Sequence, residues 1–122
     1  MKIIIAGSRN FNVPISTIYG LLNLLCSESG FRIDEIVSGH CAGVDMSGEL
    51  CAKAHGFPIK EFLPEWRNYG KSAGPIRNAH MAKYADALLL IWDGESKGSA
   101  NMKEEMMKLG KPIYEVVLRK HN

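Results

Sequence analysis

Short apolar runs alternate along the chain with longer segments in which apolar residues recur at helical spacing. Continuous apolar runs of this length, several of them β-branched and ended by glycine, predict buried strands. The predicted strands are residues 2–6, 35–38, 58–62, 87–92 and 112–118. The helices expected between them begin at residues 14, 44, 74 and 98, and glycine ends three of them near residues 30, 56 and 110.

This strict alternation of strand and helix predicts the fold class. Strands joined through helices form a parallel sheet with right-handed crossovers and helices on both faces. We therefore predict an α/β fold, a single Rossmann-like doubly wound domain of about five strands over residues 1–122. The run 87–92 is the most apolar and is expected at the sheet centre, whereas 58–62 opens with proline and is expected near an edge. Residues 63–74 are expected to form a polar loop.

Composition narrows the class of protein. The 122 residues are 46% hydrophobic and 23% charged, which is typical of a globular domain and excludes a disordered, fibrous or coiled-coil chain. Fifteen Lys and Arg against thirteen Asp and Glu leave a net charge of +2, which argues against a large nucleic-acid-binding surface. The three cysteines form no CxxC motif, so we expect reduced thiols and a cytoplasmic protein. No cofactor is predicted. The apolar start is too short for a signal peptide, and no run has the length of a membrane span.

In a sheet of this type, ligands bind at the carboxyl ends of the strands, so the loops there are the candidate sites. The first loop contains Gly7, Ser8 and Arg9, of which Arg9 offers a planar cation suited to phosphate. The second is glycine-rich and leads into a helix whose first N–H groups can bind an anion. It contains Gly39, His40, Cys41, Gly43 and Asp45. No third ligand stands at usable sequence spacing from its histidine and cysteine, so no metal site is predicted.

The third candidate cluster is Arg77 and Asn78, in the first turn of a predicted helix. A cation is disfavoured at a helix N-terminus, which indicates an anionic partner, either a ligand phosphate or a carboxylate of this chain. The fourth cluster follows the strand 87–92 and places glycine and serine at another helix start. It contains Trp92, Gly94, Ser96, Gly98 and Ser99.

The tryptophans are candidates for stacking on a base. Trp92 is equally compatible with filling the core edge, and Trp66 lies in the predicted loop. Each glycine loop alone is explained as well by a simple turn. Two facing glycine loops with two arginines together predict a nucleotide or sugar-phosphate site.

Several motifs spread over residues 2–115 resemble one family. They are Gly7-Ser8-Arg9-x-Phe11, Ser38-Gly39-x-x-Ala42-Gly43-Val44-Asp45, Trp66-x-x-Tyr69-Gly70-Lys71-x-Ala73-Gly74-Pro75-x-Arg77-Asn78-x-x-Met81, Ala85-Asp86-Ala87 and Trp92-Asp93-Gly94-x-Ser96-x-Gly98. Together they resemble the SLOG superfamily, and within it the YspA/YpsA-like branch, also called DUF2493. The resemblance implies a Rossmann-like binder of nucleotides or nucleotide derivatives, related to LOG phosphoribohydrolases and to the DNA-processing protein DprA.

The resemblance also bears on catalysis. LOG enzymes cleave an N-glycosidic bond with an arginine, which Arg77 matches, and a glutamate, at whose position this chain has Met102. A thioether cannot stabilise an oxocarbenium-like centre or manage a water, so Asp45 and Glu49 are the candidate substitutes. Enzymatic activity is therefore an open question at this point.

The leading hypothesis is a module that senses or sequesters a phosphorylated nucleoside or an ADP-ribose-like derivative, and the resemblance adds a homo-oligomer. The expected ligand-binding residues are Gly7, Ser8, Arg9, Gly39, Gly43, Asp45, Trp66, Arg77, Asn78, Trp92, Gly94, Ser96, Gly98 and Ser99. One alternative is a LOG-like nucleoside-monophosphate hydrolase with Arg77, Asp45 and Glu49 as catalytic residues. Another is DprA-like binding of single-stranded DNA, which the near-neutral charge supports poorly.

Overall fold

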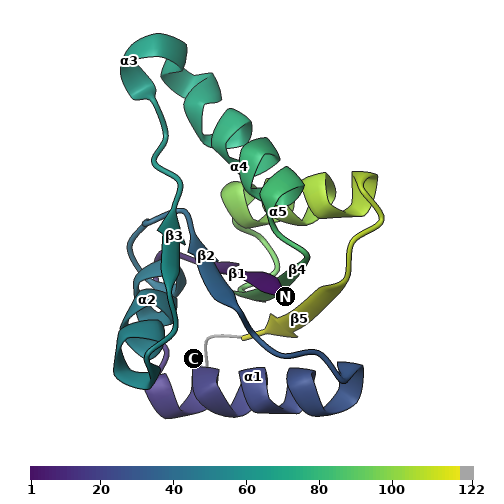
Figure 1. Cartoon of the computed structure of the whole chain (residues 1–122). Helices are drawn as coiled ribbons and strands as arrows, with labels where there is room; N and C mark the ends of the chain where they lie inside the picture. The colour runs from purple at the N-terminus through teal and green to yellow at the C-terminus, as the bar shows by residue number, and fades with distance from the viewer. Residues whose placement is uncertain (119–122) are drawn as a thin grey trace.

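Five parallel strands form one sheet in the order β3-β2-β1-β4-β5, in a computed structural model that describes residues 1–118 (Figure 1). The last four residues of the predicted 1–122 domain lie outside the described residues. The strands are β1 (Lys2–Gly7), β2 (Glu35–Ser38), β3 (Ile59–Glu61), β4 (Ala87–Trp92) and β5 (Ile113–Val117). The helices are α1 (Ile15–Ser29), α2 (Val44–His55), α3 (Trp66–Tyr69), α4 (Ala73–Tyr84) and α5 (Lys97–Lys108).

Helices cover both faces of the sheet because successive strand residues point to opposite sides. Ile3 and Ile5 of β1 pack with α1 and α2, whereas Ile4 and Ala6 pack with α4 and α5. All six residues of β4 are buried, which explains why its sequence is continuously apolar rather than alternating. The predicted doubly wound α/β fold is confirmed.

The strand order corrects one prediction and confirms another. The apolar strand β4 is an inner strand, but the central position belongs to β1, which pairs with β2 on one side and β4 on the other. A continuously apolar sequence indicates that both faces of a strand are buried. Every inner strand of such a sheet is buried on both faces, so this pattern does not identify the central one. The proline-led strand β3 is at an edge, as predicted.

The polar loop predicted for residues 63–74 is wrong in part. It contains the one-turn helix α3 and a 3₁₀ turn at Gly70–Ser72, and α4 begins at Ala73. A four-residue helix is too short to produce a helical hydrophobic period, and none of the residues of α3 is buried. Figure 1 shows α3 at the far tip of the molecule, beyond the carboxyl end of β3.

The methionines of α5 lie mainly in the core. Met102 and Met106 are at most 1% exposed, which leaves Met107 as the exposed methionine of this helix. The predicted homo-oligomer stays a prediction. Within residues 1–118, no helix has the length and apolar character that a membrane crossing requires.

Candidate functional site

The strand order creates a crevice between the loops that follow β1 and β4. The chain proceeds from β1 toward β2 on one side and from β4 toward β5 on the other, so the loops diverge at this point of the sheet. A cavity of about 330 Å³ lies there. It is lined by Ala6, Gly7, Ser8, Arg9, Asn10, Cys41, Asp45, Arg77, Asn78, Met81, Asp93, Ser96, Lys97, Gly98, Ser99 and Met102. Nine of the predicted ligand-binding residues are among them.

The glycine loop after β2 packs directly on the loop after β1. Gly43 has a φ of 82°, and a Cβ built on it would lie 2.4 Å from the Ser8 carbonyl oxygen. The next residue, Val44, donates its N–H to the same oxygen at 3.2 Å. Gly43 therefore holds the start of α2 against the first loop, although it does not itself line the cavity. Its role in the site is to position the loop.

Replacing Gly43 by alanine is expected to destabilise the protein by about 2 kcal/mol, because a side chain here meets both backbone strain and the Ser8 carbonyl. Gly20→Ala is the matched control. Gly20 lies within α1 with nothing within 4 Å of an added Cβ, so this change is expected to stabilise by about 0.5–1 kcal/mol. Urea unfolding of both variants measures the two effects. Equal stabilities would contradict the packing described for Gly43.

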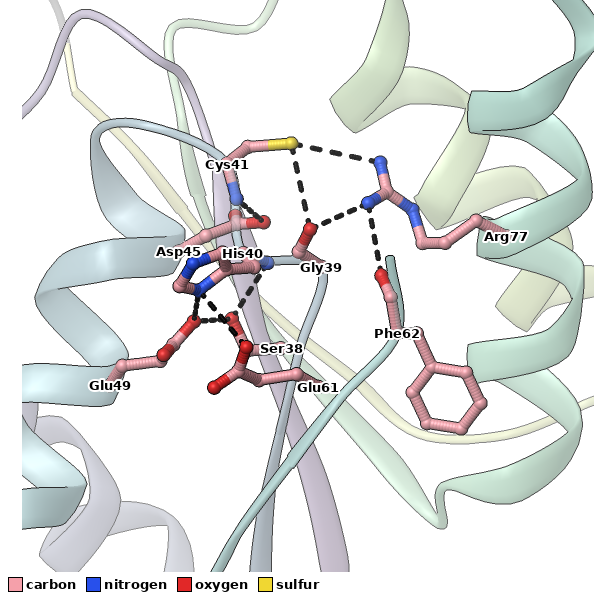
Figure 2. A network of polar contacts seen from close by, with 9 residues as sticks. All are labelled: Ser38, Gly39, His40, Cys41, Asp45, Glu49, Glu61, Phe62 and Arg77. Carbon is pink, nitrogen blue, oxygen red and sulfur yellow. Dashed lines mark hydrogen bonds and ion pairs between the residues drawn. The ribbon is translucent and has the colours of Figure 1, made fainter. Parts of the chain in front are cut away.

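Arg77 reaches from α4 to the glycine loop after β2 (Figure 2). Its Nη1 donates to the carbonyl oxygens of Gly39 at 2.7 Å and Phe62 at 3.4 Å, and its Nε donates to Asn78 Oδ1 at 2.9 Å. A Cβ on Gly39 would lie 2.7 Å from Nη1, so glycine is what admits the guanidinium. Among residues 1–118, Arg77 forms no ion pair and its hydrogen bonds go to neutral acceptors, but its charge lies close enough to Asp45 to oppose the rise in the pKa of that carboxyl group.

Asp45 lies in the first turn of α2 and contributes a buried carboxyl group to the same cavity. It is 6% exposed, and its Oδ2 accepts the Cys41 N–H at 3.3 Å. Burial raises the pKa of Asp45 to about 6, against the opposing effects of the Cys41 N–H, the Arg77 charge and the Gly7 N–H. This carboxyl group can therefore exchange a proton near neutral pH.

The N-terminus of α5 forms the opposite wall. Asp93 Oδ1 accepts the N–H groups of Glu95 and Ser96 at 2.8 and 2.9 Å, which fixes the turn and lowers the pKa of Asp93. The Ser96 hydroxyl oxygen is shielded from solvent and has no hydrogen-bond partner within the described part of the chain. The first-turn N–H groups of Lys97, Gly98 and Ser99 have no acceptor one helical turn earlier. These three N–H groups suit an anion.

The cavity lining also contains one buried amide and two methionines. Asn78 is buried, and its Nδ2 donates to Asn101 Oδ1 at 2.9 Å and to the Gly98 carbonyl at 3.4 Å, which ties α4 to α5. Met81 and Met102 are the two methionines of the lining. Met102 thus occupies the cavity at the position where the resemblance implies a catalytic glutamate.

Several residues predicted for the site lie outside this cavity. Trp66 is 54% exposed on α3, and Trp92 is 7% exposed, with its indole N–H donating to Glu115 Oε2 at 2.7 Å. Trp92 and Gly94 line a separate hollow beside β5. Glu49 is one turn deeper than Asp45 along α2 and contacts other residues. Gly39 and Gly43 also do not line the cavity; each allows a close contact that positions the glycine loop.

Glu49 belongs to a cluster that sequence spacing did not reveal. Its Oε2 lies 2.7 Å from His40 Nδ1, and Glu61 Oε2 lies 3.4 Å from the same nitrogen. Glu61 follows His40 by 21 positions in the sequence, and the pairing of Ser38 with Glu61 between β2 and β3 brings them together. Only knowledge of this strand register would have predicted the contact.

Comparison of the chain with protein-family models, with curated proteins and with solved structures finds no match.

Proposed function

We propose that this chain binds a phosphorylated nucleoside or an ADP-ribose-like nucleotide derivative in the cavity between the loops after β1 and β4, as a sensor or sequestering module. The observation that carries the proposal is one cavity lined by three cations and a helix N-terminus: Arg9, Arg77, Lys97 and the first turn of α5. Phosphate is the anion that such a set of donors recognises. The volume of about 330 Å³ is at the small end of the range for ligand sites and suits a mononucleotide.

Each part of the ligand has a counterpart in the cavity. Phosphate oxygens accept hydrogen bonds from the α5 N–H groups and the two arginines. Asp45 is placed to bond a ribose hydroxyl, and Met81 and Met102 offer apolar contact to the base. A longer derivative extends past Arg9 and Asn10, which are exposed. Stacking by Trp66 or Trp92 has no support in their positions.

A second candidate, N-glycosidic hydrolysis, is favoured by Asp45. A buried carboxyl group with a pKa of about 6 beside a cation has the properties of a general acid or base. In this reaction water adds to the anomeric carbon, the bond to the base breaks, and the base leaves with a proton. Glu49, the other predicted catalytic carboxylate, does not line the cavity. Binding without cleavage is therefore the first proposal, and cleavage through Asp45 is the second.

One experiment separates binding, cleavage and DNA binding. The purified protein is incubated with AMP, ADP-ribose or adenosine, and its Tm and the free base are followed together. Binding at 100 times the Kd stabilises by about 2.7 kcal/mol, which raises the Tm by several degrees. We expect this shift for the two phosphorylated compounds, little for adenosine, and no free base.

Three other results would change the conclusion. Base release that disappears in Asp45→Ala would establish the hydrolase and overturn a pure binder. No shift with any nucleotide, together with retention on single-stranded DNA at moderate salt, would favour the DNA-binding alternative. An equal shift with adenosine would show that the phosphate is not what the cavity recognises.

A further inference from the structure

A histidine and two glutamates from three different elements meet at the carboxyl edge of β2 and β3. His40 lies in the loop after β2, Glu49 in α2 and Glu61 at the end of β3 (Figure 2). One donor atom from each, the His40 Nδ1 and a carboxylate oxygen of each glutamate, lies within 4.8 Å of the other two. None of the three lines the proposed nucleotide cavity. The cluster is therefore a separate feature of the molecule.

The spacing of these atoms suits a small divalent ion. Zn²⁺ binds nitrogen and carboxylate oxygen at about 2.0–2.2 Å, so ligands in tetrahedral arrangement are about 3.4 Å apart. The separations from His40 Nδ1 are 2.7 Å to Glu49 and 3.4 Å to Glu61. The separation from Glu61 already has the tetrahedral value, and that from Glu49 would have to widen by about 0.7 Å to admit an ion. One nitrogen and two oxygens leave a position for water.

An unsatisfied buried carboxylate is the independent sign of a missing ligand. Glu49 is 1% exposed, and its Oε1 has no hydrogen-bond partner among residues 1–118. Its Oε2 accepts hydrogen bonds from the Ser38 hydroxyl at 2.8 Å and from His40. A buried, half-satisfied carboxylate is costly, and a cation at this cluster would compensate its charge.

Charge leads to the same conclusion. Within the described residues, the ion pairs of Glu49 and Glu61 are with His40 alone, so two carboxylates share at most one positive charge. The net negative charge of the cluster attracts a cation.

The surroundings resemble those of metal ligands in proteins. The buried Ser38 hydroxyl donates to Glu49 and accepts the backbone N–H of His40 at 3.0 Å, which orients the Glu49 carboxylate and holds the His40 backbone. The side chains of His40 and Glu61 are 40% and 42% exposed, which gives an ion a path from solvent. We propose that His40, Glu49 and Glu61 bind one divalent transition-metal ion, and that Zn²⁺ suits this set of one imidazole and two carboxylates.

Titration with Zn²⁺ tests this proposal. The full chain is treated with a chelator, and calorimetric titration and the Tm are recorded with ZnCl₂. We expect one ion per chain and a higher Tm, with weaker binding at pH 5.5 than at pH 7.5 because the metal displaces the proton on Nδ1. His40→Ala and Glu61→Gln are each expected to weaken binding about tenfold or more. Both replace exposed side chains, and circular dichroism checks that the variants are folded.

His55→Ala is the matched control, because His55 is an exposed histidine at the end of α2 whose ring stacks on Tyr19 and is not part of the cluster. It is expected to bind Zn²⁺ as the wild type does. Cys41→Ser tests the neighbouring thiol, and Co²⁺ bound to the wild type should give no thiolate charge-transfer band. Absence of Zn²⁺ binding, or binding that survives His40→Ala and Glu61→Gln, would overturn the proposal. So would binding that is lost in Cys41→Ser.

Discussion

Replacing Arg77 by alanine is expected to weaken the binding of ADP-ribose by about 100-fold, while the protein stays folded. Arg77 lines the cavity and forms no ion pair among residues 1–118, and burial raises the pKa of the nearby Asp45 to about 6, so the charge of Arg77 is available to a phosphate. Losing one partner of a buried, charged hydrogen-bonded pair typically costs 2–5 kcal/mol, and 100-fold in Kd is about 2.7 kcal/mol. Calorimetric titration of wild type and variant measures the ratio.

Two matched variants show whether the loss of affinity in Arg77→Ala is specific to this side chain or a general effect of charge. Arg67 is exposed on α3, outside the cavity, so Arg67→Ala removes the same charge from the protein and is expected to leave the Kd unchanged. Arg77→Lys keeps the charge but lacks the planar fork of donors, and it is expected to recover part of the affinity. An equal loss in Arg67→Ala would indicate a general charge effect. Full affinity in Arg77→Ala would contradict the proposed site.

Asp45→Asn is expected to stabilise the protein above pH 6 by up to about 3 kcal/mol and to have little effect near pH 4. Burial raises the pKa of Asp45 from 3.8 to about 6. Between these values the folded state binds more protons than the unfolded state, so the contribution of this group to stability is lost as the pH rises. Each pKa unit corresponds to 1.36 kcal/mol, and asparagine never ionises.

Urea unfolding from pH 4 to pH 8 measures this difference. Asp93→Asn is the control of opposite sign: N–H donors from Glu95 and Ser96 lower the pKa of Asp93, so its carboxylate stabilises the fold at neutral pH, and that contribution is lost as the pH falls. We therefore expect this variant to be less stable than the wild type at pH 7. Asp45→Asn being less stable than the wild type at pH 8 would contradict the assignment. An aspartate that costs stability at neutral pH is characteristic of a functional site.

The fold was largely predictable because its signals are local. Continuous apolar runs identified the strands, and Gly30 and Gly56 end α1 and α2 in the left-handed conformation that favours glycine. The central position of β1 was not predictable, since it depends on which way each crossover turns along the sheet. The short helix α3 was missed because one helical turn has no hydrophobic period.

The candidate site was predictable as an edge of the sheet but not in its details. Glycine loops and arginines at strand ends pointed to the edge of the sheet at which the structure has this cavity. Glu49 was predicted together with Asp45 as a catalytic carboxylate, but it lies four positions later, about 6 Å further along the helix axis, and contacts His40. Trp92 was compatible with stacking on a base until the fold placed its indole against Glu115. Contacts between distant segments, such as His40 with Glu61, require the strand register.

The most direct test of the central proposal is to map ADP-ribose binding on the backbone amides by nuclear magnetic resonance. If the cavity is the binding site, the largest shifts will fall on two segments that are far apart in the sequence. These are Ser8, Arg9 and Asn10 after β1, and Lys97, Gly98 and Ser99 at the start of α5. Saturating ADP-ribose that leaves these amides unchanged, or that shifts only residues outside the cavity, would contradict the proposal.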